Sequence, residues 1–248
     1  MFFPSPRTYK SDAKSENIVA CLHLSAKKPP QKSSLHTTMV RYVVLDGNIG
    51  AGKTTALSGL RARGIVAVTE PVDEWCSDFS HRGETHPSPI SLYYNDPSRN
   101  SMSFQLHVLT TCVNKFVRAF ASLGPDQVAV VERDPFDLAL FVEDNVRQNR
   151  FSALDHKVFS DLVSSMRGLV RAEHVANVYL RLSPEKCMER IRQRSRDAES
   201  AIDVEYVRGL HELHDEKYSS LTVPHIVVDA SEAPSSVCDK IAEFVSGI

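Results

Sequence analysis

From Arg41 onward, the chain alternates between short apolar runs and longer stretches in which apolar residues recur every three or four positions. The short runs are rich in Val and Ile and almost continuously apolar, which is typical of strands buried on both faces. The longer stretches, such as TTALSGLRAR and HKVFSDLVSSMRGLVRA, have the period of helices. Because strands and helices alternate, the pattern predicts an α/β fold with a five-stranded parallel sheet and helices on both of its faces. The predicted strands span residues 41–46, 65–70, 127–132, 176–182 and 225–230.

Two segments lack both periods. Residues 1–40 are rich in Ser, Lys and Pro, and we interpret them as a disordered basic extension before a single folded domain over residues 41–248. Their composition also suits a mitochondrial transit peptide, although their basic residues are mostly Lys, and a translation start at Met39 is a further alternative. Residues 81–99 are rich in Pro, Ser and Asn, and they are predicted to form a long functional loop.

Composition narrows the possible classes of function. A chain of 248 residues with 42% hydrophobic residues can bury a sizeable core, as one globular domain or two small ones at most. Its formal net charge of −2 does not favour a nucleic-acid or membrane-surface partner, and no apolar stretch approaches the roughly 18 residues of a membrane helix. The five cysteines are scattered without metal-ligand spacing, which indicates reduced thiols. We therefore expect a soluble intracellular protein, cytoplasmic unless its first forty residues direct it to mitochondria.

Residues 47–54, GNIGAGKT, fit the pattern G-x-x-x-x-G-K-[ST] at every fixed position. The loop lies between a predicted strand and a predicted helix, where its backbone N–H groups and the positive end of the helix can hold a polyphosphate. The ammonium group of Lys53 would contact the outer phosphates, and the hydroxyl group of Thr54 can ligate Mg²⁺. The sequence therefore predicts a nucleoside triphosphate site formed by Gly47, Asn48, Ile49, Gly50, Ala51, Gly52, Lys53, Thr54 and Thr55.

Charged residues follow two further strands of the predicted sheet. One strand ends at Glu70 and another at Glu132, which Arg133 follows. Ligands of an open parallel sheet bind beyond the carboxyl ends of its strands, so these groups are expected beside the phosphate loop. Phosphoryl transfer to a hydroxyl group requires a carboxylate that accepts the proton and another near Mg²⁺. Solvated strand ends are the simpler alternative. The loop alone also fits a motor ATPase or a GTPase, but the DxxG and NKxD motifs of a GTPase are absent.

Four arginines, at positions 190, 192, 194 and 196, follow the fourth predicted strand. On a helix, Arg190 and Arg194 would share one face, where they could stabilise a phosphoryl group in transfer as part of a mobile lid. A solvated basic face is the simpler alternative, and a nucleic-acid patch is disfavoured because acidic residues flank the cluster.

The motif HELH at residues 211–214 looks faintly like a metal site. Its two histidines are three positions apart, and the sequence offers no third ligand beside them. We therefore expect a surface helix here.

These motifs resemble those of the deoxynucleoside kinase family, which includes deoxycytidine, deoxyguanosine and mitochondrial thymidine kinases and, more distantly, herpesvirus thymidine kinases. The resemblance runs from about Arg41 to Ala230. It implies a P-loop NTPase-type three-layer fold with an arginine-rich lid, and 5′-phosphorylation of a salvaged deoxynucleoside by ATP with Mg²⁺. It also implies a homodimer, for which the apolar face of residues 104–123 could serve. The resemblance is specific because five motifs occur in the family's order at similar spacing. They are GNIGAGKTT, EPVDEW, YNDPSRNSMSFQ, ERDPF, and RIRQRSRDAES followed by DVEYVRGLHELH.

The resemblance also implies roles for individual residues. Glu70 corresponds to the carboxylate that takes the proton from the sugar 5′-hydroxyl. Arg133 corresponds to the group that holds that hydroxyl and the Glu70 carboxylate in place. Glu132 corresponds to a metal-associated carboxylate. Tyr94 and Glu199 correspond to the pair that bonds the 3′-hydroxyl. The remaining correspondences are Gln105 for the edge of the base, Phe104 and Trp75 for the pocket walls, and Arg190, Arg194 and Arg196 for the lid over ATP.

The sequence departs from the family pattern at two positions. Asp134 follows Arg133 where the family usually has Ser, and Ala198 stands where a second lid glutamate is frequent. Neither change removes a required group, but Asp134 leaves the charge around Arg133 open. Two other functions stay open as well. One is a nucleoside monophosphate kinase such as a thymidylate kinase, for which ERDPF partly matches the required DRY-like motif; the other is a non-enzymatic, nucleotide-gated binding or scaffold protein.

Three apolar residues bear on the choice of substrate. In relatives that prefer deoxycytidine or purines, an arginine and an aspartate enter the base pocket; here Cys112 and Leu138 hold those positions, and Val108 faces the same space. The pocket therefore has room for the methyl group of thymine and no charge pair to satisfy. The amide of Gln105 can pair with thymine or cytosine by turning. We expect thymidine first, deoxycytidine second and purines poorly; a deoxycytidine or purine deoxynucleoside kinase is the alternative.

Overall fold

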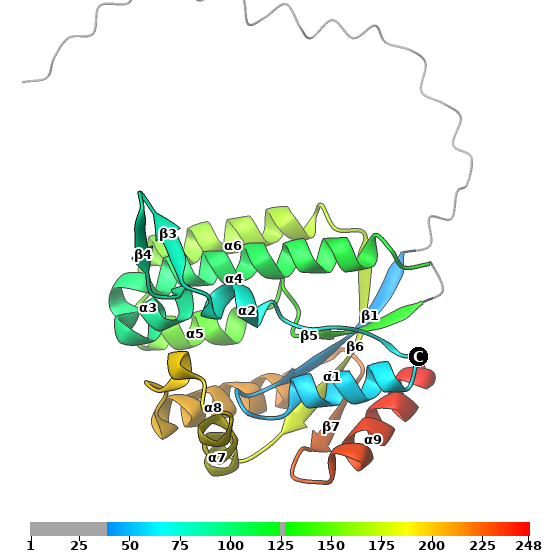
Figure 1. The fold of residues 1–248 in the computed structure, drawn as a ribbon. Helices are drawn as coiled ribbons and strands as arrows, with labels where there is room; N and C mark the ends of the chain where they lie inside the picture. Colours follow the sequence, from blue (N-terminus) through cyan, green and yellow to red (C-terminus); the bar gives the residue numbers. More distant parts are fainter. Residues whose placement is uncertain (1–38, 125–126) are drawn as a thin grey trace, which may run out of the picture. The chain divides into compact units, whose positions relative to one another are not determined.

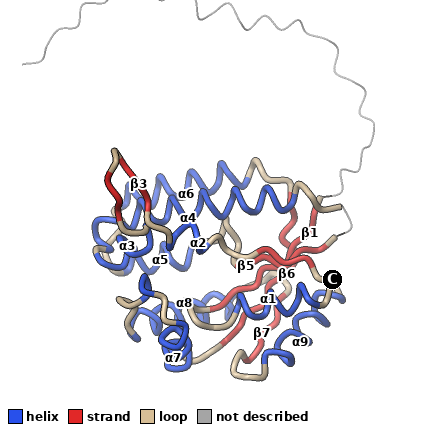
Figure 2. The backbone as a smooth tube through the Cα atoms, in the orientation of Figure 1, coloured by secondary structure: helices blue, strands red, loops and turns tan. Residues whose placement is uncertain are grey.

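A five-stranded parallel sheet lies at the centre of the computed structural model, which describes residues 39–124 and 127–248 (Figure 1, Figure 2). All its pairings are parallel, in the order β2-β5-β1-β6-β7, as predicted. β2 is shorter than predicted because its pairing with β5 ends at Val68, and β6 begins earlier than predicted because it pairs with β1 from Ala172. The strands are β1 Val40–Gly47, β2 Val66–Val68, β5 Val128–Glu132, β6 Ala172–Arg181 and β7 His225–Asp229.

Helices cover both faces of the sheet and give the predicted three layers (Figure 1). They are α1 Lys53–Ala62, α2 Val72–Cys76, α3 Pro89–Asn95, α4 Pro97–Phe120, α5 Ala139–Arg147, α6 Ala153–Arg167, α7 Pro184–Arg194, α8 Val204–Ser220 and α9 Pro234–Ser246, with the short 3-10 helix η1 Asp197–Glu199. Because side chains alternate along a strand, Val43 and Leu45 of β1 face one layer while Tyr42 and Val44 face the other. The first pair packs against α1, α7 and α9, and the second packs against α4.

The segment predicted as a long loop, residues 81–99, is largely regular structure instead. It includes part of a hairpin of β3 Phe79–His81 and β4 Glu84–His86, followed by α3 and the start of α4. Ser88 and Asp96 cap these two helices with their side chains, each directly before a proline at the first helical position. The prediction was wrong because the high proline content, which indicated a loop, includes two prolines that begin helices here.

The apolar face predicted to serve a dimer, on residues 104–123, is used inside the chain. Its buried members are Phe104, Val108, Leu109, Phe116 and Phe120. These side chains pack against the sheet and against neighbouring helices, so they are not available to a partner. Val117 is the large apolar side chain that this segment exposes, and an exposed apolar row of three lies on α6, at Leu154, Val158 and Leu162.

Residues 1–38 lie outside the described residues, so the predicted extension and its targeting role stay predictions. The described residues form one compact unit. Across the two described ranges, no helix has both the length and the apolar character needed to cross a bilayer.

β1 lies at the middle of the sheet, with β5 on one side and β6 on the other. At such a switch in connection order, a crevice opens beyond the carboxyl ends of the strands. The residues that follow β1, β2 and β5 meet there, together with α7 and η1. The fold therefore brings the predicted chemistry to one edge of the sheet.

Candidate active site

Glycines shape the loop at residues 47–54. Gly50 and Gly52 have φ angles of 80° and 100°, a region that is strained for any residue with a side chain. A Cβ atom at Gly50 would also lie 2.6 Å from the carbonyl oxygen of Cys187 on α7. α1 begins directly after the loop, at Lys53. The loop and the amino end of α1 thus have the backbone arrangement that phosphate binding requires.

Lys53 lies beneath this loop, away from solvent. Its ammonium group donates hydrogen bonds to the carbonyl oxygens of Gly47 and Asn48, both at 2.9 Å. Burial, together with repulsion from the guanidinium group of Arg133, lowers the pKa of Lys53 to about 8. Asn48 is anchored in turn, because its side-chain amide donates to the carbonyl oxygen of Val207 on α8 at 2.8 Å. The loop therefore fixes its cation through its own backbone.

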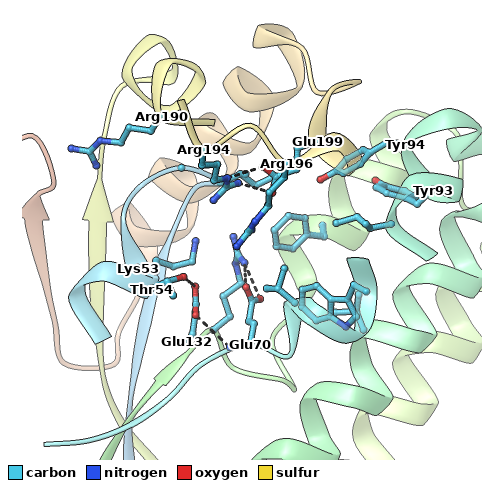
Figure 3. A pocket seen from close by; sticks show the side chains of 18 of the residues that line it. Lys53, Thr54, Glu70, Tyr93, Tyr94, Glu132, Arg190, Arg194, Arg196 and Glu199 are labelled. Carbon is cyan, nitrogen blue, oxygen red and sulfur yellow. Dashed lines mark hydrogen bonds and ion pairs between the residues drawn. The ribbon is translucent and has the colours of Figure 1, made fainter. Parts of the chain in front are cut away.

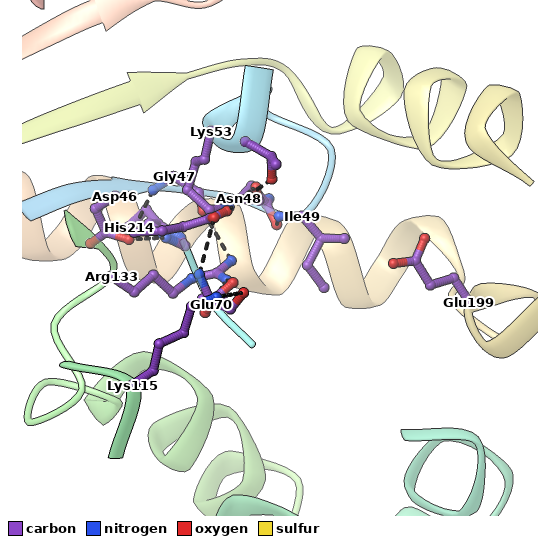
Figure 4. Close-up of polar contacts among 12 residues, drawn as sticks. Asp46, Gly47, Asn48, Ile49, Lys53, Glu70, Lys115, Arg133, Glu199 and His214 are labelled. Carbon is purple, nitrogen blue, oxygen red and sulfur yellow. Dashed lines mark hydrogen bonds and ion pairs between the residues drawn. The ribbon is translucent and has the colours of Figure 1, made fainter. Parts of the chain in front are cut away.

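A buried ion pair joins the ends of two strands. Arg133 Nη1 donates to both carboxylate oxygens of Glu70, at 2.8 and 2.6 Å, and Nη2 donates to the carbonyl oxygen of Gly47 at 3.2 Å (Figure 4). Burial alone would lower the pKa of Arg133, but the Glu70 carboxylate outweighs burial and raises it, so the guanidinium group stays charged. Arg133 has a φ angle of 56°, a strained conformation of the kind that clusters at functional sites. The pair therefore holds a carboxylate in a fixed orientation at the end of the sheet.

Glu132 lies between the glycine loop and Glu70. One of its carboxylate oxygens accepts a hydrogen bond from the Thr54 hydroxyl group at 3.2 Å, and the other accepts from the main-chain N–H of Glu70 at 3.3 Å. Burial raises the pKa of Glu132, and the nearby Glu70 carboxylate raises it further. Mg²⁺ prefers oxygen ligands and commonly takes one or two from the protein, with phosphate and water at the other positions. Thr54 and Glu132 fit that ion.

A cavity of about 500 Å³ opens beside the ion pair (Figure 3). Aromatic side chains form much of its wall. The rings of Tyr93 and Phe104 stack with their centroids 4.7 Å apart, and Trp75 packs edge-on against Phe104 with centroids 6.4 Å apart. Trp75 Nε1 donates to Thr111 Oγ1 at 2.8 Å, which fixes the indole ring. Gln105 is buried and lines the same cavity, where its amide offers both a donor and an acceptor. The cavity suits a planar ring with a polar edge.

Glu199 and the arginines behind it close another side of the cavity. Arg194 donates to both carboxylate oxygens of Glu199, each at 2.7 Å, and Arg196 donates to one of them at 3.3 Å (Figure 3). Arg190 points elsewhere, because its guanidinium group donates to the carbonyl oxygens of Ala51 at 3.2 Å and of a residue directly after β7 at 2.9 Å. Arg194 and Arg196 therefore accompany Glu199, whereas Arg190 braces the glycine loop.

Most of the predicted site residues line this one cavity. Gly47, Asn48 and Ala51 belong to the same loop but are not among the residues that line it. The predicted residues that do line it are Ile49, Gly50, Gly52, Lys53, Thr54, Thr55, Glu70, Trp75, Tyr94, Phe104, Gln105, Val108, Glu132, Arg133, Leu138, Arg190, Arg194, Arg196 and Glu199.

Cys112 does not line the cavity, contrary to the prediction that it faces the base. It packs against the apolar cluster that includes Trp75 and Leu138. Two helical turns after Gln105 place it about 10 Å further along the axis of α4, which explains the error. Burial raises the pKa of its thiol well above the usual value, so it remains protonated.

Asp134, where the chain departs from the family pattern, turns away from the Glu70–Arg133 pair. Its carboxylate accepts hydrogen bonds from the Tyr42 hydroxyl group at 3.3 Å, from Arg167 at 3.4 Å and from the main-chain N–H of Phe136 at 2.8 Å. Burial raises its pKa. Its charge is therefore directed to the layer of α4 and α6, and Arg133 pairs with Glu70 alone.

The HELH motif lies on α8, but its second histidine is not on the surface as predicted. The ring nitrogens of His214, which is fully buried, lie 2.6 Å from the carbonyl oxygen of Leu210 and 3.3 Å from an oxygen of Asp46. The Asp46 carboxylate also accepts from Lys217 at 2.9 Å and from Tyr218 at 3.1 Å. Over the residues that the structure describes, no cluster of three or more His, Cys, Asp or Glu could hold a metal ion. The motif fastens α8 to β1.

Sequence reasoning missed several residues at the site. Tyr93, Phe141 and Tyr206 also line the cavity, and Lys115 on α4 donates to the backbone of Glu70. Tyr93 directly precedes the predicted residue Tyr94, and Tyr206 lies in the motif DVEYVRG, so the motifs could have indicated both residues. Phe141 and Lys115 carry no local signal, because only the packing of α4 and α5 on the strand ends brings them in.

A three-layer fold around a parallel sheet, with a glycine loop after β1 and charged groups at the neighbouring strand ends, defines a P-loop phosphotransferase. Residues 43–246 match the deoxynucleoside kinase family, and the chain belongs to that family. Enzymes of this family transfer a phosphoryl group from ATP or a deoxynucleoside triphosphate to a nucleoside hydroxyl group.

Three relatives illustrate the range of the family. The chain is 29% identical to human mitochondrial thymidine kinase 2 over 195 residues, covering 76% of this chain and 70% of the human one. It is 31% identical to the thymidine kinase of Ictalurid herpesvirus 1 over 207 residues, covering 81% of this chain and 84% of the viral one. The structure of deoxyadenosine kinase from M. mycoides with bound dATP matches with a TM-score of 0.67 at 22% identity, covering 83% of this chain and 99% of that one. The last likeness concerns the fold alone.

Proposed function

We propose that this kinase transfers the γ-phosphoryl group of ATP to the 5′-hydroxyl group of a deoxynucleoside, with thymidine preferred. The observation that carries the proposal is the Glu70–Arg133 ion pair, with both carboxylate oxygens within 2.8 Å of one guanidinium nitrogen. Both residues line the cavity that also reaches Lys53 and Thr54 of the glycine loop. A nucleoside with its base against the aromatic wall would present its 5′-hydroxyl group to this carboxylate.

The charged groups divide the reaction between them. Glu70 accepts the proton of the 5′-hydroxyl group while the hydroxyl oxygen bonds to the γ-phosphorus and the bond from that phosphorus to the oxygen of ADP breaks. Arg133 orients the Glu70 carboxylate, and Lys53 stabilises the charge of the transferred group. Mg²⁺ would be held by Thr54 and Glu132 and would neutralise phosphate charge.

The sugar would be recognised by Tyr94 and Glu199. Both line the cavity, and Glu199 is held in place by Arg194 and Arg196. Burial raises the pKa of Tyr94, so its phenol keeps the proton that it would donate to the 3′-hydroxyl group. An ionised Glu199 can accept the hydrogen of that hydroxyl group.

The preference for thymidine is supported by the apolar side chains around Gln105. Val108 and Leu138 line the cavity and are buried, so the methyl group of thymine meets no charged group at these two positions. Cys112 is not among the residues that line the cavity, which leaves these two positions to support the preference. The human and the viral relatives are both named thymidine kinases.

A substrate competition tests the proposal. Thymidine, deoxycytidine, deoxyadenosine and deoxyguanosine are supplied together at equal concentration with Mg-ATP, and we expect dTMP as the main product. Glu70→Gln should lower kcat by about 10²- to 10⁴-fold while ATP binding is retained. A purine deoxynucleoside monophosphate as the main product would contradict the thymidine preference, and full turnover by Glu70→Gln would contradict the assigned base. Adding dTMP as the acceptor tests the monophosphate kinase alternative, because dTDP would then form.

We also infer that the kinase is a homodimer that associates through α6. Leu154, Val158 and Leu162 are spaced four residues apart and therefore share one side of this helix. They are 70%, 39% and 36% exposed, which is unusual for three large apolar side chains in one row. A second copy of the chain would cover this row.

A further inference from the structure

The main chain of Glu70 lies beyond the region that the sheet holds. β2 is an edge strand of three residues, and its pairing with β5 ends at Val68. Thr69 and Glu70 therefore receive no ladder hydrogen bonds, and Pro71, which follows them, has no N–H to donate. Other groups must set the position of Glu70.

Lys115 supplies one of those groups. This α4 residue donates from its ammonium group to the Thr69 hydroxyl oxygen and to the Glu70 carbonyl oxygen, both at 3.1 Å (Figure 4). The main-chain N–H of Glu70 donates to Glu132, and its carboxylate accepts from Arg133. The N–H, the carbonyl and the carboxylate of Glu70 are thus each held by a different side chain.

We propose that Lys115 is a positioning residue for the base of the phosphoryl transfer, an inference that rests on the proposed role of Glu70. Lys115 is on the helix that carries Gln105 and Val108, which line the nucleobase side of the cavity. A small displacement of a reacting group can lower an enzymatic rate by about 10²-fold, so loss of this contact acts on the chemical step. Seating the nucleobase and aiming the base then depend on one rigid element, α4.

Four variants test this role by steady-state kinetics with Mg-ATP and the preferred deoxynucleoside. Lys115→Met removes both hydrogen bonds and should lower kcat by about 10-fold or more. Lys115→Arg can donate to the same two oxygens and should recover most of that loss. Thr69→Val removes one acceptor and should give an intermediate kcat. Arg118→Met removes an exposed cation from the same helix and serves as the matched control.

The binding of substrate separates positioning from a general structural role. Trp75 is the single tryptophan of the chain and lines the cavity, so its fluorescence reports nucleoside binding. We expect Lys115→Met to bind nucleoside and ATP within about twofold of wild type, since the contacts of Lys115 are to Thr69 and Glu70.

The outcomes distinguish this inference from the proposed function. A kcat for Lys115→Met equal to that of Arg118→Met would overturn the role of Lys115, and so would a loss that Lys115→Arg fails to recover. Should Lys115→Met prove unfolded by circular dichroism, an unchanged kcat in Thr69→Val would overturn it equally, because that variant removes one of the two acceptors of Lys115. A wild-type protein that phosphorylates no deoxynucleoside, or a fully active Glu70→Gln, would instead overturn the proposed function.

Discussion

Lys53 is the residue of the glycine loop whose charge is most sensitive to its surroundings. Its ammonium group is buried between two backbone carbonyl oxygens, and its pKa is lowered to about 8 because burial and Arg133 both disfavour the charge. A bound triphosphate would favour the charged form and raise that pKa. Binding is therefore coupled to proton uptake by Lys53 once the pH exceeds about 8.

We accordingly predict that the affinity for ATP is nearly constant below pH 8 and falls above it. The sign follows because free Lys53 loses its proton above pH 8 whereas the complex retains it; the dissociation constant then rises by up to about tenfold per pH unit. Titration with ATP between pH 7 and 9.5 measures the effect. Lys53→Arg, which stays charged, should remove the pH dependence. A flat wild-type profile up to pH 9.5 would contradict the coupling.

At the scale of one element, α8 connects the site to the core. Val207 accepts the hydrogen bond of Asn48 in the glycine loop, and Tyr206 lines the cavity. Near its other end, His214 and Lys217 contact Asp46, directly before the loop. Burial alone would raise the pKa of Asp46, but Lys217 and His214 outweigh burial and hold the pKa well below its usual range. α8 thus supports the glycine loop from below through a buried, charged contact.

Asp46→Asn should destabilise the protein by about 2 kcal/mol, because it removes the buried carboxylate that accepts hydrogen bonds from Lys217 and Tyr218, although Lys217 keeps its ion pair with Asp137. Urea unfolding at pH 7 measures the change. The contribution of Asp46 is fully present above its ordinary pKa of 3.8 and is lost as the pH falls through the depressed folded-state pKa. The difference in the free energy of unfolding between wild type and Asp46→Asn should therefore become smaller at acidic pH. Glu216→Gln, which removes an exposed partner of Arg147, is the control and should change stability by less than about 1 kcal/mol. Equal stability of the two variants would contradict the role of Asp46.

At the scale of the whole molecule, the parts predictable from the sequence were those with a local signature. The Val-rich runs around Val43 and Val130 predicted the sheet, because strands buried on both faces must be apolar throughout. The glycine loop followed from a motif whose backbone conformation glycine alone adopts without strain. The early end of β2 and the contact from Lys115 to Glu70 could not be predicted, since both depend on how α4 packs against a sheet edge. The position of Cys112 outside the cavity was missed for a related reason: helix periodicity gives the face on which a residue lies but not how far the cavity extends along the helix.

The exposed row on α6 leads to a prediction for the assembled molecule. Light scattering coupled to size-exclusion chromatography should give a dimer for wild type and a monomer for Leu162→Glu, because a buried, unpaired carboxylate disfavours association. Val227→Glu, at a 53% exposed position on β7, is the matched control and should stay dimeric. A monomeric wild type at tens of micromolar, or a dimeric Leu162→Glu, would contradict association through α6.

The nucleobase wall and the phosphate loop belong to different layers of the protein. α4 and the turn before α5 supply Val108 and Leu138, whereas the connection from β1 to α1 supplies the loop. Substitutions in the layer of the nucleobase wall can therefore change which nucleoside is accepted. The layer of the phosphate loop, and with it the geometry of phosphoryl transfer, can stay unchanged. Lys115 limits that freedom, because it lies on α4 and yet holds the backbone of Glu70. A lineage that acquires a new nucleoside is expected to vary at Val108 and Leu138 well before it varies at Lys115.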